Sequence, residues 1–282
     1  QLKNNVHVLT LTATPIPRTL SLTIFGDLDV STIQGMPPGR TPITTRLVQP
    51  DQSKKVYQYL FELLDKGQQG YVVVPLVEET DLGLKSVMAH AQSLREGFLK
   101  GKKVGVVHGR LKSEERETTM EAFRKGAIDV LVATTVIEVG VDIANATMMV
   151  IEHADRFGLA QLHQLRGRVG RGTLPGICAL IANPTTDDAL QRLQVIAETT
   201  NGFLIAERDL EIRGPGELFG AKQSGLAPFK VATLPRDFDL LRLARRNATD
   251  WIEKDPTLRN APLLKARLMH VHGKALGLGD VA

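Results

Sequence analysis

Short apolar runs alternate with amphipathic segments through most of the chain. Every position is apolar or nearly so at 71–77 (YVVVPLV), 130–134 (VLVAT) and 148–152 (MMVIE). Runs of this length, rich in β-branched residues, are typical of strands that are covered on both faces. The pattern therefore predicts an α/β fold, with a parallel sheet and helices on both of its faces.

The same pattern predicts the individual elements. Strands are expected at 43–48, 71–77, 104–108, 130–134, 148–152 and 177–182, and helices at 52–66, 86–100, 113–125 and 159–171. After Pro184 the pattern becomes mainly helical, with helices expected near 188–199, 237–254 and 263–272. Prolines and glycines crowd 35–42, which excludes regular structure there and indicates a linker.

One amide and two guanidinium groups recur at helical spacing near the middle of the chain. Gln164, Arg168 and Arg171 are spaced i, i+4 and i+7, so a continuous helix would present all three on one face. Gly167 and Gly170 would lie inside that helix, where each costs about 1 kcal/mol relative to alanine. A solvated basic helix is the alternative, but it gives no reason for the glycines. We therefore expect the stripe to bind phosphate, because arginine stays charged and offers paired donors.

A second polar group follows the apolar run at 130–134. Thr134 and Thr135 come first, and a turn containing Gly140 and Asp142 comes next. Hydroxyl and backbone N–H groups at a strand end can hold nucleic-acid phosphates. Asp142 could accept from a ribose hydroxyl or pair with an arginine. An Asx turn with buried threonines is equally compatible with this composition.

Other candidates are weaker. His108 has no second histidine, cysteine or carboxylate at a metal-ligand spacing and is interpreted as a core histidine, so no metal site is expected. Arg110 is the better phosphate contact. Thr12 and Thr14 could be an ordinary strand end, but they precede the linker and could relay movement between two lobes.

Composition narrows the class of protein. The net charge of +4 and the pI near 9.2 permit a polyanionic partner, while 5% aromatic residues argue against a base-stacking surface. A single cysteine, Cys178, excludes an internal disulfide and suggests a reducing compartment. With no apolar run of membrane length and no signal-peptide pattern, we expect a cytoplasmic monomer that has no membrane partner.

Two features are missing for a complete phosphate site. The chain has no G-x-x-x-x-G-K-[ST] loop and no Asp-Glu dipeptide at a strand end to hold magnesium. It also starts without methionine and runs almost at once into an apolar segment. We therefore expect an excised fragment that carries half of an active site.

These segments together resemble the second motor domain of superfamily 2 helicases. TAT at 12–14 corresponds to motif III, VATTVIEVGVDI at 132–143 to motif V, and QLHQLRGRVGR at 161–171 to motif VI. More narrowly, two segments resemble the RecG family of branched-DNA translocases. They are HADRFGLAQLHQLRGRVGRG at 153–172 and ERDLEIRGPGELFGAKQSG at 207–225. The transcription-repair coupling factors share much of this pattern.

The resemblance implies a division of the chain into three parts. Residues 1–40 would be the end of a first motor domain and a linker, and 41–184 a second, RecA-like domain. Residues 185–282 would form a translocation motif, with a helical hairpin and loop, and C-terminal helices.

The resemblance also implies roles at a nucleotide site between two motor domains. Arg168 and Arg171 would reach the β- and γ-phosphates of ATP, and Gln164 would help to position them. The turn of Gly140 and Asp142 would lie near the ribose or the arginines. Mg²⁺ and most of the ATP contacts would come from the first motor domain.

DNA contacts and coupling residues follow from the same resemblance. Arg110, Thr134 and Thr135 would grip the DNA backbone. In the translocation motif, Arg192, Arg213 and Gln223 would convert domain movement into a swing against duplex DNA, although the residues by themselves favour a simple surface helix and a glycine loop.

The implied whole protein is an ATP-dependent double-stranded DNA translocase that remodels stalled forks and Holliday junctions in recombination and repair. The fragment alone is expected neither to hydrolyse ATP nor to unwind DNA. The alternatives are a translocase like the transcription-repair coupling factor, or a non-catalytic nucleic-acid-binding module.

Overall fold

The structure is a computed structural model that describes residues 31, 33, 42–75, 81–135, 143–213 and 237–272. Several residues singled out in the sequence lie outside these ranges: Thr12, Thr14, Gly140, Asp142 and Gln223. Arg213 is the last residue of a described helix, but its side chain is not described.

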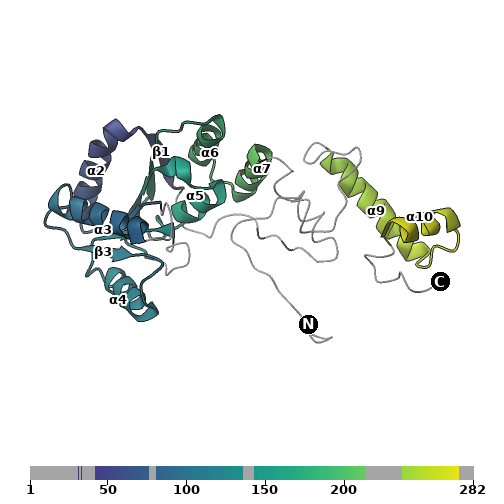
Figure 1. The fold of residues 1–282 in the computed structure, drawn as a ribbon, viewed down its shortest axis with the longest axis horizontal. Helices are drawn as coiled ribbons and strands as arrows, with labels where there is room; N and C mark the ends of the chain where they lie inside the picture. The colour runs from purple at the N-terminus through teal and green to yellow at the C-terminus, as the bar shows by residue number, and fades with distance from the viewer. Residues whose placement is uncertain are drawn as a thin grey trace. The chain divides into compact units, whose positions relative to one another are not determined.

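A parallel sheet forms the centre of the first of the two compact units of the chain (Figure 1). Its strands run in the order β1-β6-β5-β2-β4-β3, and every pair of neighbours is parallel. The strands are β1 (Thr44–Val48), β2 (Gln69–Val73), β3 (Val104–Val107), β4 (Val130–Ala133), β5 (Ala146–Glu152) and β6 (Ile177–Ile181). The predicted α/β fold with a parallel sheet is confirmed.

Helices cover both faces of the sheet. Those packed on one face are α2 (Ser53–Asp65) and α3 (Asp81–Glu96). Those that contribute to the other face are α4 (Ser113–Arg124), α5 (Leu159–Arg166), α6 (Asp187–Glu198) and α7 (Gly202–Arg213). Short 3-10 turns precede α2 and α5, namely η1 (Pro50–Gln52) and η3 (Ala154–Arg156).

The strands alternate between two apolar cores, as expected for a sheet covered on both sides. Val72 and Val150 pack with Leu60 of α2, whereas Ile151 packs with Leu162 of α5. All of these side chains are fully buried, and each contributes roughly 1.5–3 kcal/mol relative to an exposed position. The apolar runs of the sequence are thus the strands of this double core.

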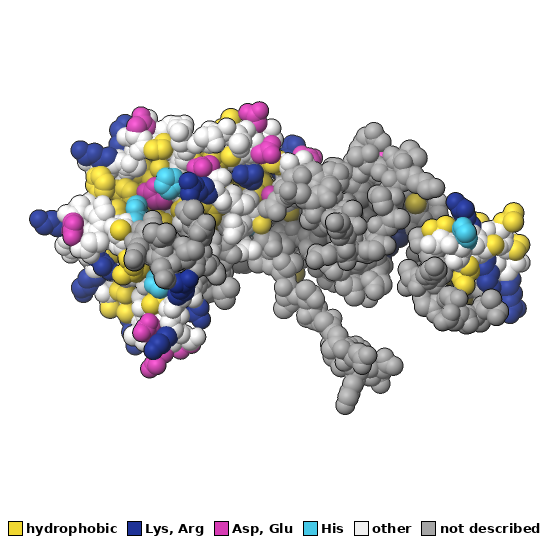
Figure 2. Space-filling model, viewed as in Figure 1, with side chains coloured by type: hydrophobic (Ala, Val, Ile, Leu, Met, Phe, Trp, Pro, Cys, Tyr) yellow, Lys and Arg dark blue, Asp and Glu magenta, His cyan; other side chains and the backbone are white. Residues whose placement is uncertain are grey.

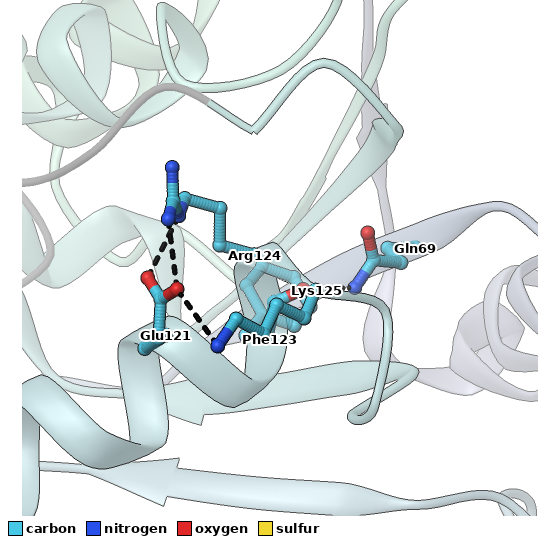
Figure 3. Close-up of polar contacts among 5 residues, drawn as sticks. All are labelled: Gln69, Glu121, Phe123, Arg124 and Lys125. Carbon is cyan, nitrogen blue, oxygen red and sulfur yellow. Dashed lines mark hydrogen bonds and ion pairs between the residues drawn. The ribbon is translucent and has the colours of Figure 1, made fainter.

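A buried amide connects the start of β2 to the end of α4 (Figure 3). The Gln69 Nε2 donates to the carbonyl of Phe123 at 2.6 Å and to that of Ile128 at 2.7 Å. Nearby on the surface, Glu121 accepts two hydrogen bonds of 2.7 Å from Arg124. The buried amide donates hydrogen bonds to carbonyl groups at and just after the end of α4, which would otherwise lack partners. The exposed ion pair adds little stability.

The compact unit built on the sheet extends beyond Pro184, through Ile212. Leu193 and Ile196 of α6 and Ile205 of α7 belong to the core on the α5 side of the sheet. Helix α7 was not predicted from the sequence. The signal for it was Asn201, whose Oδ1 accepts from the backbone N–H of Phe203 at 3.0 Å and so caps the helix.

Two further helices belong to a second unit, α9 (Phe238–Lys254) and α10 (Pro262–His272). Asp255 lies between them, and its carboxylate accepts from the backbone N–H groups of Arg259 at 2.9 Å and Asn260 at 2.8 Å. Both helices were expected from the sequence. Across the described ranges, no helix has the length and apolar character needed to cross a membrane.

Candidate functional site

The predicted phosphate-binding stripe is not one helix. Helix α5 ends at Arg166, and Gly167 is its C-terminal cap. Arg168 and Arg171 therefore lie on the segment 167–172 that follows, here called the arginine loop. The prediction that both arginines share a helical face with Gln164 is wrong.

Gly170 explains why the helix cannot continue. Its φ of +65° is in the left-handed region, which glycine adopts without strain. A Cβ at this position would lie 3.0 Å from the Cα of Gly176, so the backbone there would have to shift to accept a side chain. The Gly170 N–H also donates to the carbonyl of Ala146 at 3.2 Å. The glycines thus end the helix and pack the arginine loop against β5 and the start of β6.

Both arginines of the loop act on the same side chain of the sheet. Tyr71 of β2 is 2% exposed, and burial raises the pKa of its phenol to about 12 even though the charges of Arg168 and Arg171 lower it. Arg171 also donates from Nε to the carbonyl of Gly167 at 2.8 Å. Two positive charges therefore converge over one part of the sheet, next to α5, where Gln164 is half-buried.

A third arginine of the motif is structural. Arg166 is 3% exposed, and its Nη1 donates to the carbonyls of Ile196 at 2.6 Å and Thr199 at 2.8 Å. These carbonyls belong to the C-terminal end of α6, where partial negative charge accumulates. The sequence analysis missed this role, although Arg166 follows the core residue Leu162 by four positions and so shares its buried face.

His163 completes this buried contact. Its Nδ1 lies 3.1 Å from Nη2 of Arg166, and because arginine can only donate, Nδ1 is the acceptor. Burial, and secondly the positive charge of Arg166, lower the pKa of His163 to about 4. The ring is therefore neutral at pH 7, with its proton on Nε2.

A second arginine holds α6 at another point. Arg192, predicted to act in translocation, donates to the carbonyl of Asp155 in η3 at 3.3 Å. Together, Arg166 and Arg192 connect α6 to the last residue of α5 and to η3, which precedes α5. Helix α6 is thus held to the end of α5, where the arginine loop begins, through side-chain hydrogen bonds as well as through apolar packing.

The predicted DNA contacts lie at the carboxyl ends of two neighbouring strands, β3 and β4. Arg110 is exposed and Thr135 half-buried. Thr134 is 1% exposed, and its Oγ1 has no hydrogen-bond partner among the described residues. The alternative of a buried threonine therefore holds for Thr134 in this conformation, whereas Arg110 and Thr135 remain accessible.

No metal site is found in the parts of the chain that the structure describes, since no three histidine, cysteine, aspartate or glutamate side chains there are grouped to hold an ion. The charged groups that converge in this region are cationic. The site as described is therefore suited to an anion.

This fold and the arginine loop are those of a helicase motor domain. Residues 53–173 match the family described as the helicase conserved C-terminal domain. Residues 199–275 match the family described as ATP-dependent DNA helicase RecG, domain 3, C-terminal. The chain belongs to the RecG family.

Individual relatives agree with this assignment. The chain is 48% identical over 275 residues to the ATP-dependent DNA helicase RecG of Synechocystis sp., which covers 97% of this chain and 33% of the relative. It is 51% identical over 272 residues to the protein of the same name from Streptococcus pneumoniae, which covers 96% of this chain and 40% of the relative. The chain thus spans well under half the length of these relatives.

A solved structure is also similar. The structure of RecG bound to a three-way DNA junction superimposes with a TM-score of 0.65 at 47% sequence identity. The match covers 81% of this chain and 30% of that one.

The close packing at Gly170 predicts a specific loss of stability. Gly170→Ala should cost about 2–4 kcal/mol in the free energy of unfolding, from left-handed strain together with the clash against Gly176. Gly126 is the matched control, because its φ is +73° but a Cβ there would meet nothing within 4 Å. Gly126→Ala should cost only about 1 kcal/mol. Urea unfolding measures both, and equal losses would contradict the packing argument.

His163 predicts a pH dependence of stability. Its folded pKa of about 4 is below the ordinary 6.5, so as pH falls the unfolded chain takes up the proton first. The contribution of the neutral His163 ring to the free energy of unfolding is complete above pH 6.5 and is lost as pH falls towards 4. Urea unfolding at several pH values should show this decline, and His163→Gln should reduce it. An identical decline in both proteins would show that His163 does not titrate in this way.

Proposed function

We propose that this chain is the second motor domain and translocation region of an ATP-dependent double-stranded DNA translocase that remodels branched DNA in recombination and repair. The observation that carries the proposal is the arginine loop, which places two cationic side chains together and is connected to α6 through Arg166. The names of the relatives support the same activity. We expect the protein to act in the cytoplasm as a monomer.

The arginine loop fits the phosphates of a nucleotide. Bound ATP with Mg²⁺ supplies the phosphoryl group whose transfer to water drives the motor, and most of its contacts would come from a domain outside this chain. Arg168 and Arg171 would stabilise negative charge on the β- and γ-phosphates, and Gln164 would orient them. An arginine in this role contributes about 10³–10⁵ in rate. Gly140 and Asp142 are proposed to lie near the ribose.

Arg110 and Thr135 are proposed to contact the DNA backbone, because they are accessible at adjacent strand ends. Thr134 would have to become exposed to join them. Contacts of this kind position a motor on DNA without reading sequence. They suit a protein that moves along duplexes of any sequence.

Movement at the nucleotide is proposed to reach the DNA through α6. Arg166 holds the end of α6 next to the arginine loop, and Arg192 holds its middle to η3. Arg213 and Gln223 would continue this path into the translocation motif. Thr12 and Thr14 would relay movement from the first motor domain.

The motor proposal separates two classes of variant in the longer protein that contains this chain. Arg171→Ala should reduce DNA-stimulated ATP hydrolysis by about 10³-fold, because transition-state charge is no longer stabilised. Arg213→Ala should retain most of the ATPase but lose unwinding of a three-way junction. A phosphate-release assay and a gel-based unwinding assay measure the two activities.

The exposed Arg124, which pairs with Glu121 away from the arginine loop, provides the control. Arg124→Ala should leave both activities unchanged. If Arg213→Ala reduced hydrolysis and unwinding together, its role in transmission would be wrong. ATP hydrolysis by the isolated chain that Arg171→Ala abolishes would show that no other motor domain is needed.

A further inference from the structure

A groove with an apolar floor runs along the edge strand β1, between that strand and α2. Its volume is about 390 Å³, and its floor includes Val48, Val56, Met148 and Ala179. These side chains come from β1, α2, β5 and β6. The groove is therefore built by the rigid sheet and its packed helix, so it is present before any partner arrives.

The rim of the groove is cationic. Arg46 of β1 and Lys55 of α2 both line it and are exposed, and none of the lining residues is acidic. Neither side chain forms an ion pair with another described residue. An apolar floor beneath two unpaired cations is complementary to a segment that carries both apolar and acidic side chains.

The backbone of β1 offers a third set of contacts. Among the described strands, β1 pairs only with β6, so alternate N–H and C=O groups along it face away from the sheet. An extended peptide can pair with such an edge and place alternate side chains in a neighbouring groove. The five residues of β1 span about 17 Å, enough for a peptide of about five or six residues.

The groove is separate from the arginine loop. It lies on the face of the sheet covered by α2, whereas α5 covers the opposite face. A domain that bound at the arginine loop would therefore leave the groove open. Duplex DNA fits it poorly, because phosphates gain nothing from an apolar floor.

We propose that this groove binds an extended acidic segment of a separate protein. Apolar side chains of the segment pack on Val48 and on Tyr59, which also lines the groove and is 40% exposed, and its carboxylates pair with Arg46 and Lys55. The segment adds to the free edge of β1. This site is independent of the proposed motor function, and its test requires no ATP hydrolysis.

The test uses fluorescence anisotropy with a labelled six-residue peptide in which aspartate and leucine alternate. The 282-residue chain should bind it, and a peptide with asparagine in place of aspartate should bind at least about tenfold more weakly. The double variant Arg46→Glu, Lys55→Glu should also weaken binding by at least about tenfold. Lys54→Glu, which makes half of that charge change at an exposed residue of α2 that does not line the groove, should change binding less than twofold.

Thermal unfolding of each variant separates loss of the site from loss of the fold. Failure of the wild-type chain to bind the acidic peptide would overturn the proposal, as would equal effects of Lys54→Glu and the double variant. A 20-base-pair duplex is the competitor. If the duplex displaced the peptide, and if the double variant also bound the duplex more weakly than the wild-type chain does, the groove would be a DNA-binding surface instead.

Discussion

The buried guanidinium of Arg166 is the contact on which the arrangement of the site depends. It is almost completely enclosed, and it satisfies two carbonyls at the end of α6. A buried charge of this kind is tolerated only when its hydrogen bonds are made, so the end of α5 and the end of α6 cannot separate without a large cost. Since Gly167 and Arg168 follow directly in the chain, the arginine loop begins from a fixed point.

The remaining geometry follows from that fixed point. Gly170 turns the chain in the left-handed region and packs against Gly176, which leads directly into β6. The loop is thus held at both ends by groups that do not themselves bind a ligand. Arg168 and Arg171 lie between them, and the charges of both lower the pKa of Tyr71 against the effect of its burial. In this account, helix α6 and the loop move together because Arg166, the residue before the loop, is hydrogen-bonded to the end of α6.

The parallel sheet and its double core could be predicted because apolar runs such as 130–134 report burial directly. The candidate site was harder to predict from the sequence. The sequence pattern predicts that Gly167 and Gly170 are interior positions of one helix, where small size allows close approach, whereas in the structure Gly170 ends the turn through its positive φ. Arg166 was overlooked because charge suggests exposure, and only the three-dimensional position of α6 supplies its partners. The roles of Asp142 and Gln223 stay predictions, since both lie outside the described residues.

Amide hydrogen exchange in the last turn of α6 tests this account most directly. In Arg166→Met, the carbonyls of Ile196 and Thr199 lose their donor, which should reduce local stability by about 1.5–3 kcal/mol. The amides of Glu198 and Thr199 should then exchange about tenfold to a hundredfold faster than in the wild-type chain, while those of α4 change little. Unchanged exchange in α6 would contradict the claim that Arg166 holds this helix to the end of α5, where the arginine loop begins.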